Sequence, residues 1–395
     1  MTPKAKKLLL NVLLVALGIG AALLLLEIGA RFLPPPFDNT TNQAEVCWTE
    51  TGWRGRPGYQ TTVATEGYVQ DLTLNRAGMH DTDHPLKKPA NTFRILLLGD
   101  SFVHAVHVKE GETAHQVLED ALNEAIKSPR VEVISAGVSG WGTGQELLYY
   151  RAEGRQYQPD LVLLMFYLGN DVKDNLPGRG ITADGVNCYT PYFVLGSNGL
   201  DPEPWQFAPG LTPATGPASP LKKAANNLLA AIYRHSRLYA QIEPLLSPAE
   251  VKASMLDFYS GDSPTFNYAL NLTTALVNQL QQEVQADGSR FGVVLVSPLG
   301  LVEFAQMDSA AREEVYQRLP IMRAAEKIDP PNVTLAKQFA ANGAPVLDLL
   351  PPFLQFSAET GRSPYFEQDQ HFNVDGNRLA GETITRWLLN QKLAP

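Results

Sequence analysis

The chain of 395 residues carries a formal net charge of −9, and 44% of its residues are hydrophobic while 18% are charged. This is the composition of an ordinary globular protein that is long enough to bury a large core. Binding to phosphates needs clustered Lys and Arg, and no basic stripe follows the first few residues. Nucleic acid is therefore excluded as the main partner.

The N-terminus has the pattern of a membrane anchor. An almost unbroken apolar run at residues 8–26 is close to the ~20 residues that span a bilayer as a helix. The residues that precede it are basic, which predicts a cytoplasmic N-terminus and an extracytoplasmic remainder; they are Lys4, Lys6 and Lys7. We expect a single-pass signal anchor in residues 1–33. A cleaved signal peptide, whose apolar core is normally shorter, is the first alternative, and a buried helix of a soluble domain is the second.

Residues 34–90 are interpreted as an irregular extracytoplasmic linker that packs on the main domain. Within it, residues 68–74 alternate well enough for an edge strand or hairpin, and residues 75–78 form a turn. The two cysteines, Cys47 and Cys188, are too few for a disulfide framework or a zinc site. An extracytoplasmic domain could pair them, but two free buried thiols explain the pattern equally well.

From residue 91 to residue 395, apolar runs with the length of buried strands alternate with segments of helical periodicity. This rhythm predicts an α/β fold, a three-layer α/β/α domain with a parallel sheet of about five strands. Residues 178–265 break the rhythm, and we expect an insertion or cap there with a helix at 221–246. The expected strands are 94–98, 131–136, 160–166, 291–296 and 344–349, and the expected helices are 113–127, 144–155, 267–286, 309–327, 333–342 and 383–392.

Four short polar or glycine-rich blocks follow the predicted strands. They are Ser101, residues 137–140, residues 169–171, and residues 369–371. Because the carboxyl ends of parallel strands lie at one edge of a sheet, we expect these blocks to converge.

The converging residue types are those that acyl transfer needs. A serine hydroxyl must pass its proton to a base as it attacks, and histidine is the usual base. A carboxylate then orients the imidazole, and Asp369 lies two residues before His371, on the same side of an extended chain. The tetrahedral oxyanion needs hydrogen-bond donors. The candidates are the backbone N–H groups of Ser101 and Gly140 and the side-chain amide of Asn170.

Each block has a simpler explanation when it is taken alone. A serine after a strand is more often a helix N-cap, and Asn170 with Asp171 could form only a turn. Residues 137–144 lack the G-x-G-x-x-G spacing of a dinucleotide site. Asp171 and Asp174 have no further ligands around them for a metal. We therefore expect neither a metal nor a cofactor.

The other histidines are weaker candidates for the base. His84 follows two aspartates but lies in the irregular N-terminal section, so we interpret it as a surface residue. His115 and Glu112 both lie at the start of a predicted helix. The remaining histidines have no carboxylate two or three residues before them; they are His80, His104, His107 and His235.

Taken in order, the four blocks resemble those of the SGNH hydrolases, the GDSL-like esterase superfamily. They are GDS at 99–101, the glycine-rich block ending at Gly140, GND at 169–171 and D-x-H at 369–371. The resemblance runs from about Leu72 to the C-terminus. It is best with membrane-anchored bacterial members, which have an N-terminal span, an N-x-x-G turn and a P-D-L-V strand. Residues 75–78 and 159–162 fit that arrangement.

The resemblance implies a flavodoxin-like fold and a role for each block. Relatives often carry glycines shortly after GDSF, where this chain has Ala105 and His107. The Asp and His are two apart instead of three, a spacing that also occurs in polysaccharide O-acetyltransferase-type members. The implied roles are Ser101 as nucleophile, Gly140 and Asn170 as oxyanion donors, His371 as base and Asp369 as its orienting carboxylate.

We expect a serine hydrolase that acts on acyl or acetyl esters at the outer face of the membrane. Its substrate would be a small-molecule or carbohydrate ester. An O-acetyltransferase acting on an extracellular or cell-envelope polysaccharide is the first alternative. A non-catalytic carbohydrate-binding relative is the second.

Overall fold

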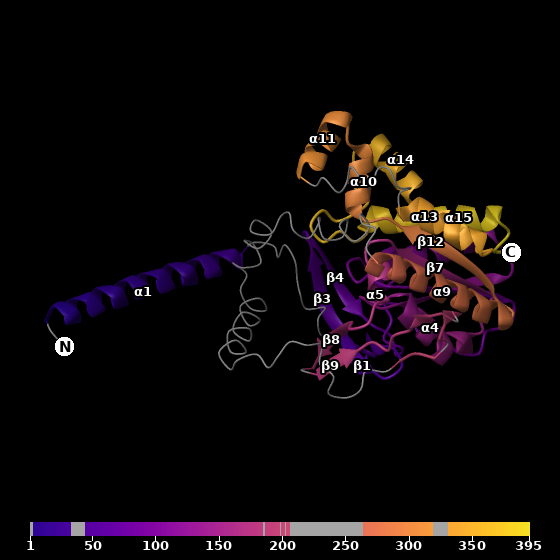
Figure 1. The fold of residues 1–395 in the computed structure, drawn as a ribbon, viewed down its shortest axis with the longest axis horizontal. Coiled ribbons are helices and arrows are strands. Elements are labelled where there is room, and N and C mark those ends of the chain that lie inside the picture. The colour runs from indigo at the N-terminus through magenta and orange to yellow at the C-terminus, as the bar shows by residue number, and fades with distance from the viewer. Residues whose placement is uncertain are drawn as a thin grey trace.

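A sheet of five parallel strands forms the centre of the computed structural model, which describes residues 3–32, 44–184, 186–197, 199–201, 203–205, 264–318 and 331–395 (Figure 1). The strand order is β13-β12-β7-β5-β6. The order reverses between β5 and β7, and such a switch point is where open α/β sheets bind ligands. The strands are β5 (Thr92–Gly99), β6 (Arg130–Gly137), β7 (Leu161–Tyr167), β12 (Arg290–Val296) and β13 (Val346–Asp348).

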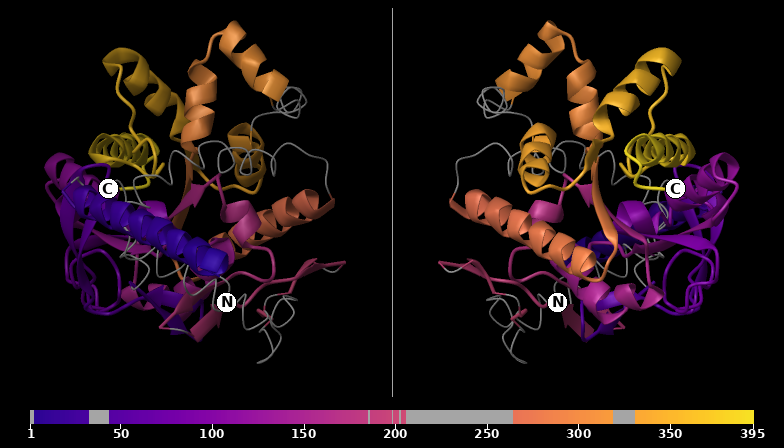
Figure 2. Two further views of the ribbon diagram at one scale, coloured as in Figure 1. Left: turned by 90° about the vertical axis from the view of Figure 1, so that its left-hand side faces the viewer. Right: turned by 90° about the vertical axis from the view of Figure 1, so that its right-hand side faces the viewer.

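Helices cover both faces of this sheet, so the predicted three-layer α/β/α fold is confirmed (Figure 2). All 7 residues of β7 are buried, as expected of a strand with a helix layer on each side. In β5, Leu96 and Leu98 face one layer while Ile95 and Leu97 face the other. One layer contains α4 (Thr143–Ala152), α9 (Pro264–Ala286) and α13 (Pro331–Ala341), and the other contains α3 (Ala114–Ala125), α14 (Leu350–Thr360) and α15 (Val374–Asn390).

The N-terminal section contains two β-hairpins, where the sequence predicts one strand or hairpin. The second of them covers the predicted stretch 68–74. Two further small hairpins lie between residues 180 and 200, inside the segment predicted as an insertion, whose residues 206–263 and helix 221–246 lie outside the described residues. The hairpins are β1 (Glu45–Trp48) with β2 (Gly52–Gly55), β3 (Gln60–Thr65) with β4 (Tyr68–Thr73), β8 (Gly180–Ala183) with β9 (Val186–Tyr189), and β10 (Leu195–Gly196) with β11 (Gly199–Leu200).

A disulfide joins two of these hairpins. Cys47 of β1 is bonded to Cys188 of β9, across a sequence separation of 141 residues and a Cα–Cα distance of 5.2 Å. Of the two possibilities that the sequence left open, the structure therefore contains the disulfide.

Helix α1 (Pro3–Ala30) extends away from the rest of the protein (Figure 1). Its most apolar stretch has a mean hydropathy of 2.7, and none of that stretch is buried. The helix is long and apolar enough to cross a membrane, and a signal sequence would have the same properties.

The closing helix α15 begins at Val374, whereas the sequence predicts a start at residue 383. Gly376 and Gly381 lower the helical propensity of its first half, which concealed that half. Both glycines have a structural use. A Cβ at position 376 would come within 2.0 Å of Pro364 O, so the glycine lets the preceding loop approach the start of α15, where the Asn373 side chain caps the helix by accepting a hydrogen bond from Gly376 N (3.0 Å). A Cβ at position 381 would come within 2.7 Å of Val117, so the glycine lets α15 approach α3 closely.

Three helices project beyond the sheet at the top of Figure 1: α10 (Leu299–Gln306), α11 (Ser309–Arg318) and α14. The sequence did not predict α10 or α14. Two prolines stand at the start of α14, where a missing N–H costs no helical hydrogen bond. The predicted helix 309–327 is described only as far as Arg318. The remaining short helices are α2 (Ser101–His104), α5 (Asp171–Asp174) and the 3-10 turns Glu110–Glu112 and Gly154–Tyr157.

Candidate active site

Ser101 lies in the first turn of α2, directly beyond the end of β5. The helix cap is the preceding residue, because the Asp100 side chain accepts a hydrogen bond from Phe102 N (2.9 Å). Ser101 is therefore not the N-cap that a serine after a strand usually is. Its hydroxyl is left to hydrogen-bond elsewhere.

Ser101, His371 and Asp369 form one hydrogen-bonded chain. Ser101 Oγ lies 2.7 Å from His371 Nε2, and His371 Nδ1 lies 2.7 Å from Asp369 Oδ1. In a neutral ring with a hydrogen on Nδ1, that nitrogen donates to the carboxylate and Nε2 accepts the hydrogen of the serine hydroxyl. This is the tautomer that a general base needs.

The Asp369–His371 pair is joined by a tight turn, and the extended chain expected from the sequence is wrong here. Gln370 has a φ of +68°, a left-handed conformation that costs a non-glycine residue about 1–2 kcal/mol. His371 N donates to Asp369 Oδ1 (3.3 Å). Phe366 closes the turn, since its carbonyl accepts from Gln370 N (3.0 Å) and its N–H donates to His371 O (2.9 Å). We call residues 366–371 the acid–base loop.

Asp369 and His371 each stabilise the charged form of the other. Burial alone would raise the pKa of the Asp369 carboxyl, but the charge on His371 and the hydrogen bonds from its ring and backbone lower it to about 2. Burial acts to lower the pKa of His371, and the charge and hydrogen bond of Asp369, helped by the charge of Asp100, raise it by more. The net pKa of His371 therefore lies above its ordinary value of 6.5.

Two hydrogen bonds fix the backbone of Ser139, next to Gly140. Trp53 Nε1 donates to Ser139 O (3.0 Å), and Ser139 N donates to His104 Nδ1 (3.3 Å). In a planar trans peptide the C=O and N–H point in opposite directions, so the bond from Trp53 also fixes where the Gly140 N–H points. Gly140 itself has a φ of +75°, which favours glycine.

Two of the predicted oxyanion donors are open. No residue in the described part of the chain accepts a hydrogen bond from the backbone N–H of Ser101 or of Gly140. Both residues are partly exposed, so their N–H groups are free to bind a substrate oxygen.

The third predicted donor, Asn170, follows β7 and precedes α5. Its Nδ2 donates to Asp174 Oδ2 (2.8 Å), which also accepts from Arg179 Nη2 (2.6 Å). Arg179 reaches towards Gly140, since a Cβ built on that glycine would lie 3.7 Å from Arg179 Nη2. The observed partner of the amide is thus Asp174, and the Asn170 side chain also stabilises the Asp100 carboxylate by a hydrogen bond.

His107 belongs to this site, although its neighbours in the sequence make it a weak candidate. Its ring stacks on His371, with centroids 4.2 Å apart and planes at 19°, and its Nε2 lies 3.5 Å from Asp369 Oδ2. Burial, together with the charge on His371, lowers the pKa of His107 to about 3. The ring is therefore neutral at physiological pH. No local pattern signals this role, because its carboxylate partner lies far along the chain.

The ligand atoms of His107, Asp369 and His371 lie within 4.8 Å of one another, a spacing that could hold a metal ion. The stacking of the two rings works against a metal. Parallel rings direct their nitrogen lone pairs side by side, whereas a tetrahedral metal needs ligands that converge. Within the described ranges no other group of three His, Cys, Asp or Glu has such a spacing.

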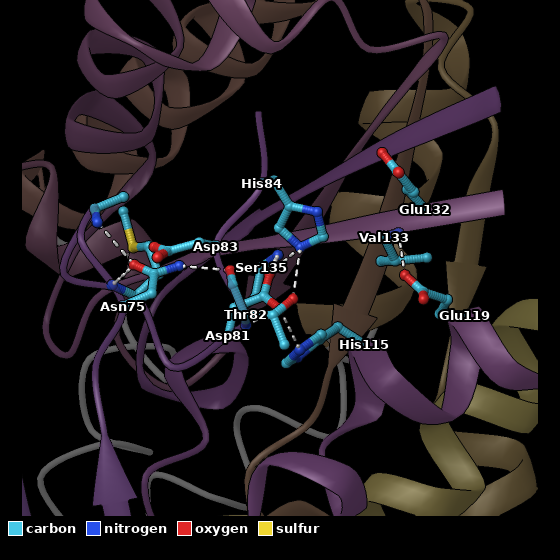
Figure 3. Close-up of polar contacts among 12 residues, drawn as sticks. Asn75, Asp81, Thr82, Asp83, His84, His115, Glu119, Glu132, Val133 and Ser135 are labelled. Carbon is cyan, nitrogen blue, oxygen red and sulfur yellow. Dashed lines mark hydrogen bonds and ion pairs between the residues drawn. The ribbon is translucent and has the colours of Figure 1, made fainter. Parts of the chain in front are cut away.

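His84 is not the surface residue that the sequence suggests, because its side chain is only 11% exposed and its Nε2 lies 3.2 Å from Asp81 Oδ2 (Figure 3). Asp81 also lies 3.5 Å from His115 Nε2 and accepts a hydrogen bond from Ser135 N (2.8 Å). The hydroxyl of Ser135 donates to Val103 O and to no imidazole. This second Asp–His cluster therefore ties the segment before β5 to β6 and has no activated serine.

A cavity of about 440 Å³ lies beside this second cluster, and none of the residues of the serine–histidine–aspartate chain lines it. Its charged side chains are already paired with one another: Arg54 with Glu153 at 2.9 Å, and Arg76 with Asp83 at 2.9 Å.

Comparison with known proteins gives no family assignment. No protein-family model matches the chain, and no curated protein matches its sequence. Among solved structures, the acetyl xylan esterase AlAXEase aligns at 13% identity and a TM-score of 0.37 over 75% of this chain and 100% of that chain. A catalytic mutant of an acetylxylan esterase from Geobacillus stearothermophilus aligns at 11% and 0.37 over 74% and 93%. A GDSL-like lipase from Bacteroides thetaiotaomicron aligns at 13% and 0.33 over 75% and 88%. At these values we base no argument on the likeness.

The interaction between Asp369 and His371 predicts a raised pKa for His371, which can be measured. In the full chain in detergent, NMR of labelled histidine should place the pKa of His371 above 6.5. Asp369→Asn should lower that pKa, because the charge is removed while the burial that opposes protonation stays. His84, which is held by Asp81, is the internal control and should titrate unchanged. An unchanged His371 pKa in the variant would show that Asp369 does not hold the ring.

Proposed function

We propose that this chain is a serine hydrolase of the SGNH type that acts on ester bonds, with Ser101, His371 and Asp369 as its catalytic triad. The observation that carries the proposal is the chain of two hydrogen bonds, each 2.7 Å, from Ser101 Oγ through the His371 ring to Asp369. The open backbone N–H groups of Ser101 and Gly140 support it, because acyl transfer needs donors for an oxyanion.

The residues divide the reaction as follows. His371 Nε2 takes the proton of Ser101 as Oγ attacks the ester carbonyl carbon, and Asp369 stabilises the imidazolium that forms. The carbonyl oxygen becomes an oxyanion, which the N–H groups of Ser101 and Gly140 and the amide of Asn170 stabilise. His371 then gives its proton to the leaving alkoxide as the C–O bond breaks, and the acyl group remains on Ser101.

The second half of the reaction depends on the acyl acceptor. Water attacks the acyl-enzyme in an esterase, and a sugar hydroxyl attacks it in a transferase; in both, His371 removes the proton of the attacking oxygen and returns it to Ser101 Oγ. We favour the esterase. The two-residue spacing of Asp369 and His371 keeps the transferase as the alternative.

The nucleophile can be tested directly. Ser101→Ala should reduce turnover of a short-chain aryl acetate by roughly 10³-fold or more, because only oxyanion stabilisation and binding remain. Ser135→Ala is the matched control, since it removes a buried serine hydroxyl outside the triad. Full activity of Ser101→Ala, measured by release of the aryl alcohol, would rule out the nucleophile.

The acceptor can be identified from the products. With an acyl donor and an oligosaccharide in water, the favoured esterase should yield free acid and leave the oligosaccharide unmodified in mass spectrometry. An acyl-oligosaccharide that Ser101→Ala does not form would replace the esterase by the transferase. Neither product, from a protein that binds the oligosaccharide, would favour a non-catalytic carbohydrate-binding relative.

We also propose that α1 anchors the protein in a membrane, with the N-terminus in the cytoplasm and residues 91–395, the catalytic unit, outside. The length and hydropathy of α1 support an anchor. The Cys47–Cys188 disulfide supports an oxidising compartment for the remainder, because disulfides are rare in the cytosol.

An impermeant lysine reagent tests this topology in spheroplasts that express the chain. Lys87, which is exposed, should be labelled, and Lys4 should be labelled only after the membrane is permeabilised. A mature chain that lacks Lys4 would instead identify a cleaved signal peptide, and labelling of Lys4 in intact spheroplasts would reverse the orientation.

A further inference from the structure

Loop 366–371 has an unexpected partner in the N-terminal section. The carboxylate of Glu66 accepts hydrogen bonds from three consecutive backbone N–H groups of this acid–base loop. Oε2 is 2.9 Å from Glu367 N, and Oε1 is 2.5 Å from Gln368 N and 2.9 Å from Asp369 N. Successive N–H groups that converge on one anion form a recognised anion-binding arrangement of backbone.

Glu66 occupies a strained position to make this contact. It lies with Gly67 in the two-residue turn between β3 and β4, and the two residues have φ of +47° and +85°. Positive φ at both central positions is the type I′ pattern, which favours Asn, Asp and Gly. A glutamate there costs about 1–2 kcal/mol of backbone strain. Its longer side chain is what reaches the acid–base loop.

The contact therefore joins two strained turns, at Glu66 and at Gln370. Strained non-glycine residues persist when their surroundings hold them firmly, and they gather at functional sites. Gln370 must keep its left-handed conformation for His371 to face Ser101 while it is bonded to Asp369. The three bonds to Glu66 fix the backbone immediately before Gln370.

The same hairpin is anchored to the segment that follows the nucleophile. Gln70 donates to Val106 O, Tyr68 donates to Glu112, and the Tyr68 ring lies 6.5 Å from the Phe366 ring. Val106 also packs with the apolar side chains of the hairpin. The β3–β4 hairpin thus bridges the chain after Ser101 and the loop that carries His371.

We propose that Glu66 is a positioning residue for the Asp369–His371 pair: its carboxylate, bound to three backbone N–H groups, holds the acid–base loop in the turn that places His371 against Ser101. The inference rests on the function proposed above, since it assigns Glu66 a part in that triad. Glu66 does not touch the reacting atoms, so its effect must pass through the loop.

Glu66→Asp separates this role from a general contribution to folding. Aspartate keeps the charge and suits the I′ turn better than glutamate, so the thermal midpoint should not fall. It withdraws the carboxylate by one methylene from the loop. We expect kcat for an aryl acetate to fall roughly 10- to 100-fold, with KM largely unchanged, and the pKa of His371 to move down towards 6.5.

Glu66→Gly is the second variant, because glycine fits the turn without strain and removes the carboxylate altogether. Its kcat should fall at least as far as that of Glu66→Asp. Asp71→Glu is the matched control: it changes by one methylene an exposed acid of the same hairpin, whose carboxylate accepts a hydrogen bond from Thr62 Oγ1 (2.9 Å). This control should keep the kcat and the His371 titration of the wild type.

Each outcome decides the proposal. Wild-type kcat and His371 pKa in both Glu66 variants would overturn it, and so would losses of activity that merely follow a lowered thermal midpoint. Low kcat with a retained midpoint and a lowered His371 pKa would support it. A wild-type chain that hydrolyses no ester would end the proposed function, while the His371 titration would still report whether Glu66 holds the loop.

Discussion

The candidate site depends on the hydrogen bond between Asp369 and His371. The Asp369 side chain is only 4% exposed, and a buried carboxylate is costly unless its oxygens are paired. One oxygen accepts from both the ring and the backbone N–H of His371, and the other lies 3.5 Å from His107. Satisfying the buried charge in this way sets the tautomer of His371, and the tautomer lets Nε2 accept from Ser101.

The N-terminal hairpins belong to this arrangement as much as the sheet does. Trp53 of β2 holds the peptide that carries the Gly140 N–H, and in the β1–β2 hairpin Trp53 pairs with Cys47, which is bonded to Cys188. Trp141 in turn donates to Trp53 O (3.0 Å). The disulfide thus closes a path of direct contacts from β9 to a proposed oxyanion donor.

Much of the site was predictable because its residues follow strands. Ser101 and Asn170 stand beyond the ends of β5 and β7, and parallel topology alone brings such ends to one edge. The Asp369–His371 pair was visible because it is local. The turn that brings these two residues together was not predictable, because a glutamine at position 370 does not indicate a left-handed backbone conformation.

The supporting residues could not be predicted for a different reason. Trp53, Glu66 and His107 act through contacts with residues far away in the chain, and their neighbours in sequence say nothing of those contacts. Each contact depends on how a hairpin or loop docks on the finished sheet. The first half of α15 and helix α14 were hidden in a related way, because glycines and prolines that read as helix breakers are placed where close packing or a first helical turn accepts them.

Three buried acidic residues affect how well the site can stabilise an oxyanion. Asp100, Glu146 and Asp171 are fully buried. Asp100 is adjacent to Ser101 and interacts electrostatically with the other two acids, so ionised carboxylates here would repel an oxyanion. Burial raises the pKa of Asp100 to about 6, and burial together with the charge of Asp100 raises those of Glu146 and Asp171 well above their ordinary values. The shifts favour the uncharged form of Glu146 and Asp171. The charge on Asp100 helps to raise the pKa of His371, so it favours the imidazolium. Burial disfavours the ionised form of all three acids and so limits the negative charge that opposes the oxyanion.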